Sequence, residues 1–378
     1  MRLAAWVRLA NVANDADVKG LNSRALHALL SEFGSPQAVL EASLASLARV
    51  VGPALAAALR DRTPTPAIEH MLAWSAVSGN HLLTWDDPRY PRSLLELGDA
   101  PVLLFCKGDP LLLNAPAIAI VGSRNASPAG LLVAEEFAAA LASAGLTVIS
   151  GLALGIDAAA HRGALRALAG IGQQSASTIA VIGTGIDRVY PPRNRGLAHQ
   201  IAKRGAIVSE FPLETPPFAG NFPRRNRLIS GLAQGVLVVE ATLGSGSLIT
   251  ARLAGEQGRE VFAIPGSIHS PFSKGCHKLI REGAKLVETA EDVLEELKWP
   301  GAVSDRASST RKRDTKDARA SGPDGTLLLD ALGFAPTTTD ELCARLGWPV
   351  DRVLASMLQL ELAGSLAHTS GGRVQRIA

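Results

Sequence analysis

The sequence predicts an α/β protein built on a doubly wound parallel sheet. Between about residues 116 and 290, short apolar segments alternate with amphipathic helical patterns, which is typical of a sheet covered by helices on both faces. Glycine-rich turns follow several of the apolar segments. The chain has 378 residues, which is too long for one typical domain, so we expect two or three domains.

The first 75 residues predict a helical domain, because they are rich in Ala and Leu. We expect it to be SAM-like or helix-hairpin-helix-like. Asn22-Ser23 is a cap signal for a helix that Gly34 ends. Residues 50–59 read as a hairpin of two helices, with Gly-Pro entering the second. Such a turn can contact a DNA phosphate, but short helix pairs of this pattern more often only pack. Residues 80–115 read as a connector that contains one strand at 103–106.

The predicted α/β domain covers residues 80–298. Its ligands should bind at the carboxyl ends of the strands. The Pro-rich segment 211–223 shows no pattern of regular structure. The expected strands are 117–121, 146–150, 178–182, 206–209, 235–240 and 260–264, and the expected helices are 129–143, 158–168, 197–204, 225–233 and 248–257.

The C-terminal part predicts a flexible linker over residues 299–324 and a winged-helix domain over 325–378. The linker is rich in charged and small residues and has no apolar period. After it come three helical patterns and a short hairpin, which is the order of elements in a winged helix.

The distribution of charge favours a polyanionic partner. The formal net charge is only +3. From Arg188 to Arg227, however, eight Lys or Arg stand against two acids. Cys106, Cys276 and Cys343 have no metal-binding spacing, so we expect reduced thiols in a cytoplasmic protein and no metal site. No signal peptide or membrane span is predicted.

Three turns at predicted strand ends suit an anionic ligand. Gly122-Ser123-Arg124 places a guanidinium at the end of the first strand, where it can contact a phosphate. Gly244-Ser245-Gly246-Ser247 opens a helix, where free N–H groups can face an anion. Gly183-Thr184-Gly185 is weak evidence for a dinucleotide. Since GxGxxG spacing and a Walker A lysine are both absent, we expect no cofactor.

The segment around Phe222 predicts contact with single-stranded nucleic acid. Its ring stands beside Arg224, Arg225 and Arg227. An aromatic ring can stack on an unpaired base while arginines neutralise the phosphates. Flanked by Asn221 and Pro223, Phe222 is expected to lie exposed in a loop, although packing with Phe211 and Phe218 is the alternative.

Asp157 and His161 lie one helical turn apart, so a catalytic pair is conceivable. No Ser or Cys nucleophile stands in a recognised spacing with them. We therefore favour Asp157 as a helix cap and His161 as a hydrogen-bonded structural residue, and we expect no catalytic residues.

Taken together, these turns resemble the DNA-processing protein A family (DprA/Smf). The resemblance extends over roughly 180 residues, in which the motifs stand in the same order. The matching stretches are Ile118–Arg124, Ser150–Asp157, Tyr190–Arg195, Ser209-Glu210, Phe222–Arg227, Val239–Ala241, Ser245–Ala251 and Pro265-Gly266.

The resemblance implies an extended Rossmann-like fold without a dinucleotide and a homodimer formed through that domain. It further implies a non-enzymatic protein that protects incoming single-stranded DNA and loads RecA recombinase during natural transformation. In some relatives a basic residue precedes the phenylalanine. Here that stretch is Ala219-Gly220-Asn221, and Arg224 or Arg225 is the candidate replacement. The expected DNA-binding residues are Gly122, Ser123, Arg124, Gly155, Asn221, Phe222, Arg224, Arg225, Asn226, Arg227, Ser245, Gly246 and Ser247.

Two other functions remain open at this point. A Rossmann-type nucleotide-processing hydrolase would use Glu210 or Glu240, but the Pro-Gly-Gly-x-Gly-Thr turn of such enzymes has no close match here. A regulator of double-stranded DNA would act through residues 325–378. Because the third helix of that domain carries only Arg352 as a basic residue, it suits a protein contact better than the major groove.

Overall fold

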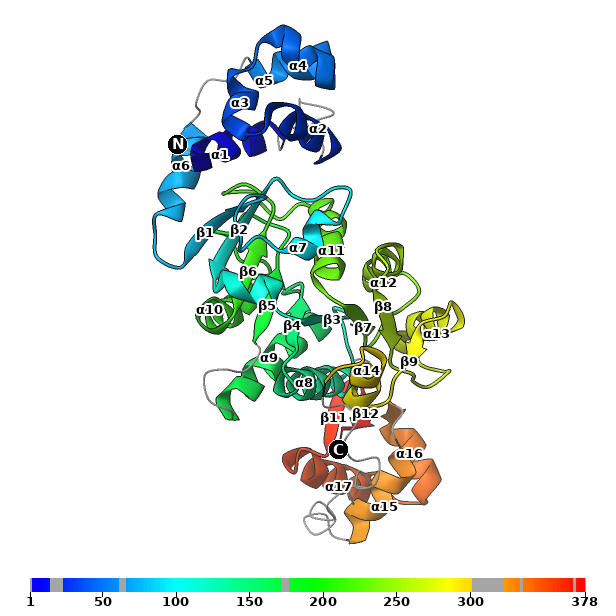
Figure 1. Cartoon of the computed structure of the whole chain (residues 1–378). Helices are drawn as coiled ribbons and strands as arrows, with labels where there is room; N and C mark the ends of the chain where they lie inside the picture. The colour runs from blue at the N-terminus through cyan, green and yellow to red at the C-terminus, as the bar shows by residue number, and fades with distance from the viewer. Residues whose placement is uncertain are drawn as a thin grey trace.

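The computed structural model describes residues 2–13, 23–60, 66–170, 177–300, 323–333, 336–369 and 372–377. Along the chain, a set of N-terminal helices is followed by a large α/β sheet with its helices and then by a small C-terminal group of helices and strands (Figure 1). The predicted linker over 299–324 lies outside the described residues except at its two ends.

A nine-stranded sheet forms the centre of the molecule, with the strand order β1-β2-β6-β5-β4-β3-β7-β8-β9. All strands from β3 to β9 run parallel, whereas β2 is antiparallel to both β1 and β6. The predicted doubly wound parallel sheet is therefore confirmed. The strands are β1 (Asn80–Thr84), β2 (Leu103–Gly108), β3 (Ala117–Val121), β4 (Thr147–Ser150), β5 (Thr178–Val181), β6 (Ala206–Ser209), β7 (Gly235–Val238), β8 (Glu260–Ala263) and β9 (Lys285–Leu286).

Strand β1 corrects the interpretation of residues 80–115 as a connector with a single strand. β1 lies at the edge of the sheet and is nevertheless largely buried. Leu82 packs into the core that the N-terminal helices share, and Leu83 packs into the core on the opposite face of the sheet. A strand buried on both faces lacks the polar alternation by which short strands are recognised.

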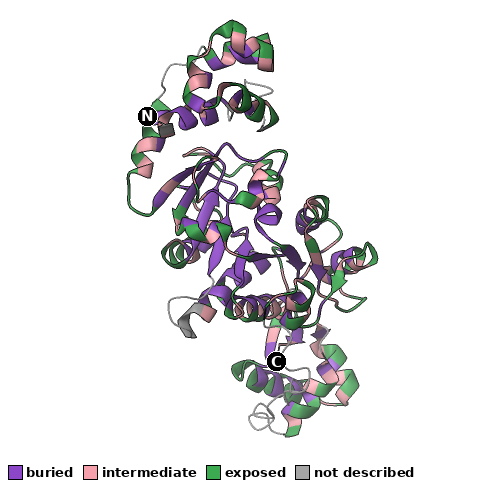
Figure 2. Cartoon of the chain, viewed as in Figure 1, coloured by how far each residue is buried: buried purple, intermediate pink, exposed green. Residues whose placement is uncertain are grey.

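Helices cover both faces of the sheet, and the strands between them are buried (Figure 2). On β3, Ile118 and Ile120 face one core, while Ala117, Ala119 and Val121 face the other. The helices of this domain are α7 (Arg92–Leu95), α8 (Pro128–Ser143), α9 (Ile156–Gly170), α10 (Arg195–Arg204), α11 (Asn221–Leu232), α12 (Ser247–Glu256), α13 (Lys274–Arg281) and α14 (Ala290–Glu296).

The N-terminal residues form the helical unit that their composition predicts. Gly52 separates α4 from α5 with a φ of +83°, so the expected helix-hairpin turn is present. His27 of this unit stacks on Trp85, which follows β1, with ring centroids 4.3 Å apart. Its helices are α1 (Arg2–Ala13), α2 (Ser23–Phe33), α3 (Pro36–Glu41), α4 (Leu44–Val51), α5 (Pro53–Arg60) and α6 (Pro66–Ser75).

The C-terminal residues fold around a core of their own, which includes Leu328, Leu342 and Val353. The three helices and the hairpin of a winged helix are all present, with a third short strand beside the hairpin. The elements are α15 (Pro323–Leu332), β10 (Thr337–Thr338), α16 (Thr339–Leu346), α17 (Val350–Leu362), β11 (Leu366–Thr369) and β12 (Arg373–Arg376). Among the described residues, no helix is long and apolar enough to cross a membrane.

Trp299 fixes the C-terminal end of the α/β domain. Its indole N–H donates to the carbonyl of Ala144 at 2.8 Å, and its ring packs against the core beneath α8. A chain ending at Pro300 should therefore keep the stability of the α/β domain. The free energy of unfolding of a chain ending at Lys298 should be lower by about 2 kcal/mol. This is less than the 3–5 kcal/mol typical of replacing a fully buried Trp by Ala.

Urea unfolding of the two truncated chains tests this expectation. Trp299→Ala in the longer chain is the matched variant, and it should reproduce the loss seen on ending the chain at Lys298. Equal stability of all three proteins would contradict the structural role of Trp299.

Candidate nucleic-acid interface

A pocket of about 690 Å³ opens at the carboxyl edge of the sheet. It lies beside β3 and β7, where the chain leaves the sheet in opposite directions: β3 is followed by β4 on one side, and β7 by β8 on the other. Crevices at such switch points are the usual ligand sites of open α/β sheets. The lining residues are Val121, Gly122, Ser123, Arg124, Ala153, Asp157, Tyr190, Pro217, Ala219, Phe222, Pro223, Arg225, Asn226, Ile229, Thr242, Ser245, Gly246, Ser247, Ile249 and Thr250.

Most of the residues that the sequence singled out line this one pocket, although they come from two turns and one helix. Among them are Gly122, Ser123, Arg124, Phe222, Arg225, Asn226, Ser245, Gly246 and Ser247. The remaining ones, Gly155, Asn221, Arg224 and Arg227, do not line it. Tyr190 lines it too, and the sequence reasoning did not select it as a site residue. Its place beside Pro191 and Arg193 carried the same signal as that of Phe222.

Two aromatic rings and one guanidinium lie close together in the pocket. The rings of Phe222 and Tyr190 lie 5.7 Å apart between centroids and are tilted by 39°. The guanidinium carbon of Arg124 lies 5.4 Å from the centroid of Phe222. Arg124 is exposed and forms no ion pair with a described residue. A cation without a carboxylate partner, beside exposed ring surface, suits a phosphate followed by a base.

Phe222 lies in the first turn of a helix rather than in a loop, because α11 begins at Asn221 and not near residue 225. The position of Pro223 explains the error: a proline in the first helical turn loses no hydrogen bond, so a Pro-rich segment can lead directly into a helix. Phe222 is half-buried against Gly183, where a Cβ atom would lie 3.1 Å from its ring.

Arg225 is buried beneath the pocket, which corrects its expected role as an exposed phosphate contact. Its side chain donates to the carbonyl of Val181 at 2.7 Å. Its guanidinium also passes so close to Gly151 that a Cβ atom there would lie 1.8 Å from Nη1. Burial lowers the pKa of Arg225 to about 10, and the nearby Asp157 carboxylate opposes this shift.

Arg224 and Arg227 are bound to a carboxylate outside the pocket, so the structure does not place them as lining residues. Both form ion pairs with Glu210, and the Arg224 pair measures 3.2 Å. Arg227 also pairs with Asp99 at 3.1 Å. Burial raises the pKa of Glu210, and the two arginines oppose that shift. These arginines therefore tie α11 to neighbouring segments.

The 244–247 turn exposes fewer backbone donors than the sequence predicts. The N–H groups of Ser247, Leu248 and Ile249 bond within the turn, to Ser245 Oγ, to the Ser245 carbonyl and to the Gly246 carbonyl. The hydroxyls of Ser245 and Ser247 lie 2.7 Å apart at the pocket wall. This turn offers the ligand hydroxyl groups rather than a complete nest of N–H groups.

Gly155 supports the pocket from behind. It adopts a φ of +76°, and a Cβ atom there would lie 2.2 Å from the carbonyl oxygen of Ser123. The turn that carries Arg124 can therefore rest directly on the turn after β4. The Ile156 N–H donates to the same carbonyl at 3.1 Å, which fixes the two turns together.

Asp157 and His161 do not form a catalytic pair. Asp157 Oδ2 accepts from the N–H groups of Gly151 and Ala153 in the preceding turn, so it holds that turn instead of capping α9. Burial raises its pKa. His161 is fully buried and bonds through Nδ1 to the hydroxyl of Thr178 at 2.7 Å. The expectation of a structural histidine is confirmed, and the cap assignment of Asp157 was wrong.

The two carboxylates that a nucleotide hydrolase would need also lie outside the pocket. Glu210 is held by the arginines of α11, and Glu240 accepts from the N–H and the hydroxyl of Ser127 at 2.9 and 2.6 Å. Neither residue lines the cavity with Arg124 and Phe222.

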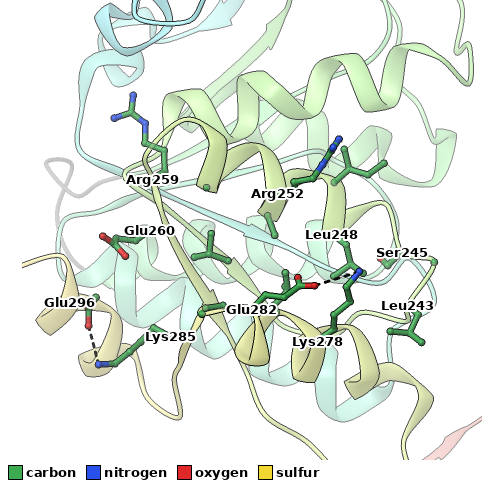
Figure 3. A pocket seen from close by; sticks show the side chains of 18 residues that line it. Leu243, Ser245, Leu248, Arg252, Arg259, Glu260, Lys278, Glu282, Lys285 and Glu296 are labelled. Carbon is green, nitrogen blue, oxygen red and sulfur yellow. Dashed lines mark ion pairs between the residues drawn. The ribbon is translucent and has the colours of Figure 1, made fainter.

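A larger cavity of about 860 Å³ lies beside α12, α13 and β8 (Figure 3). Its rim carries both signs of charge. Lys278 pairs with Glu282 and Lys285 with Glu296, as the dashed lines show. Of the predicted DNA-binding residues, only Ser245 reaches this cavity. With its cations already paired, it is a poorer anion site than the pocket around Arg124.

Comparison with known proteins gives one consistent family. Residues 81–298 match the family described as DNA recombination-mediator protein A, and residues 312–372 match the DprA winged helix domain. The chain is 44% identical to Protein Smf of Escherichia coli over 318 residues, which covers 82% of each protein.

Solved structures of DNA processing protein A also resemble the chain. DNA processing protein A from Streptococcus pneumoniae has a TM-score of 0.64 and 39% identity, covering 74% of this chain and 95% of that one. DNA processing protein A from Helicobacter pylori, described for its mode of single-stranded DNA binding, has a TM-score of 0.51 and 31% identity. It covers 58% of this chain and 95% of that one.

His161 should make stability depend on pH. Burial lowers its pKa to about 3, whereas an unfolded histidine titrates near 6.5. Between these values the unfolded chain binds more protons, so the free energy of unfolding falls as the pH falls. Between pH 7.5 and pH 5.5, the free energy of unfolding of the wild type should fall by about 1.4 kcal/mol more than that of His161→Gln. Urea unfolding at both pH values measures this difference, and equal losses would show that His161 is not held neutral.

Proposed function

The chain belongs to the DNA recombination-mediator protein A family, and from this premise we propose that it binds single-stranded DNA in the pocket beside β3 and β7. Arg124 contacts a backbone phosphate, and an unpaired base stacks on Phe222 with Tyr190 beside it. The hydroxyls of Ser245 and Ser247 and the amide of Asn226 supply further polar contacts at the pocket wall.

One observation carries this proposal: Arg124 has no carboxylate partner among the described residues and lies over an aromatic ring at the mouth of a pocket. The three arginines of the segment 224–227, in contrast, are bound to groups of the protein itself. A duplex keeps its bases stacked on one another, so a site built on ring stacking favours single strands.

We further propose that the protein acts as a homodimer through its α/β domain and loads RecA onto the bound strand during natural transformation. Both steps are what the resemblance to this family implies. The proposed domains are 1–75, 80–298 and 325–378, joined after the second by the linker 299–324. Since the pocket lies wholly within 80–298, the flanking domains serve contacts other than the primary DNA site.

A simple assay distinguishes a nucleotide-hydrolysing enzyme from the proposed DNA-binding protein. The acid that lines the pocket, Asp157, accepts from two backbone N–H groups of the turn after β4 and lies beside the buried guanidinium of Arg225, so its carboxylate already has partners within the protein. Incubation with nucleoside monophosphates should release no free base. Release at a rate that Asp157→Asn abolishes would contradict the proposed function.

Phe222→Ala should weaken the binding of single-stranded DNA about 5- to 150-fold, since stacking contributes about 1–3 kcal/mol per base. Duplex binding should change little. Phe218→Ala is the matched control, because Phe218 is 66% exposed in the preceding segment and does not line the pocket. Fluorescence anisotropy with single- and double-stranded oligonucleotides gives the affinities. A large fall in melting temperature without loss of single-strand affinity would make Phe222 a core residue.

Arg124→Ala should lower the affinity and also reduce the slope of log K against log salt by about 0.7, the contribution of one single-strand phosphate contact. Arg224→Ala is the comparison, because Arg224 is bound to Glu210 outside the pocket and should change the slope less. A titration across a salt series measures both. If Arg124→Ala leaves affinity and slope at their wild-type values, Arg124 is not part of the site.

A further inference from the structure

We propose that the exposed basic face of α10, made of Arg195, His199 and Lys203, extends the path of single-stranded DNA beyond the pocket. This inference rests on the proposed function. It assigns a second contact surface, which a strand longer than the pocket reaches after it passes Tyr190.

The three side chains form one stripe on the helix. They stand four residues apart, which places them on the same face, and all three are exposed. The opposite face of α10 packs on β2, β5 and β6 through buried residues such as Ala198 and Ile201. From Arg195 to Lys203 the stripe is about 12 Å long, which is enough for more than one phosphate of a single strand.

The cations of this stripe lack acidic partners. The sequence of α10 contains no Asp or Glu, and neither Arg195 nor Lys203 forms an ion pair with a described residue. The neighbouring helix differs, because Arg162 and Arg166 of α9 both pair with Glu135. The α10 cations are therefore available to an external anion.

Helix stability does not explain Arg195. Lys203 lies in the last turn, where a cation interacts favourably with the helix dipole. Arg195 lies in the first turn, where the dipole has the opposite sign and a cation is unfavourable. Arg195 therefore does not stabilise its own helix, and its exposed guanidinium is available to an external anion.

The stripe is continuous with the pocket through a short fixed turn. After Tyr190 the chain forms the 3₁₀ helix Pro192–Asn194 and enters α10 directly. The side-chain amide of Asn194 donates to the carbonyls of Leu152 and Ala153 at 2.8 and 3.1 Å. Because Ala153 lines the pocket, this turn holds the start of α10 beside its mouth.

Oligonucleotides of two lengths test the inference. The double variant Arg195→Ala/Lys203→Ala should bind a dT6 oligomer within twofold of wild type, because the pocket is intact. Its affinity for dT20 should fall about tenfold, and its salt slope on dT20 should be lower by about 1.4, equal to two single-strand phosphate contacts. Arg162→Ala/Arg166→Ala removes the same charge from α9 and should leave both affinities near wild type.

The outcomes separate this inference from the proposed function. Wild-type affinity and slope of the α10 variant on dT20 would overturn the inference and leave the pocket assignment in place. An equal loss on dT6 and dT20, or the same loss in the α9 control, would overturn it as well, because the effect would then be one of net charge. A wild-type protein that binds neither oligomer would overturn the proposed function and the inference with it.

Discussion

The pocket depends on the buried guanidinium of Arg225. This one side chain reaches from α11 to the carbonyl at the end of β5 and lies against the turn after β4. Asp157 completes the arrangement: it binds the N–H groups of that turn and supplies the negative charge nearby. A buried cation costs several kcal/mol unless it is compensated, so removing either partner leaves an uncompensated charge. The relative positions of α11, β4 and β5 are thereby fixed, and with them the position of Phe222.

The clustered arginines of α11 consequently have different structural roles. Arg225 holds the floor of the pocket, whereas Arg224 and Arg227 hold Glu210. None of them provides a free charge inside the pocket, and Arg124, which comes from the turn after β3, provides it instead. An anionic ligand is recognised by a cation that the protein leaves uncompensated, because a cation already paired with a carboxylate gains little from a second anion.

The sheet topology brings these parts together. The turns after β3 and β7 leave the sheet in opposite directions, and the crevice between them receives residues that lie more than a hundred positions apart in the chain. Gly155 and Gly151 permit the close approach that this convergence requires, since a Cβ atom at either position would collide with a neighbouring turn or with Arg225. The C-terminal winged helix folds around a core of its own, and the N-terminal helices pack on a core that they share with the sheet. The residues that line the pocket all come from the α/β domain.

The sequence by itself determined most strands and helices of the α/β domain and the turns that carry Arg124 and Ser245, because periodicity and glycine-rich turns are local signals. Only the tertiary structure decided which arginines stay available to an anionic ligand. Successive residues of a helix point about 100° apart, so Arg225 meets different surroundings from Arg224 and Arg227, which lie on one face of α11 and both reach Glu210. Those surroundings are Glu210, Val181 and Asp99, contributed by distant segments, and no local pattern reports them. The buried edge strand β1 was missed for the same reason, since both of its faces are covered by elements far away in the sequence.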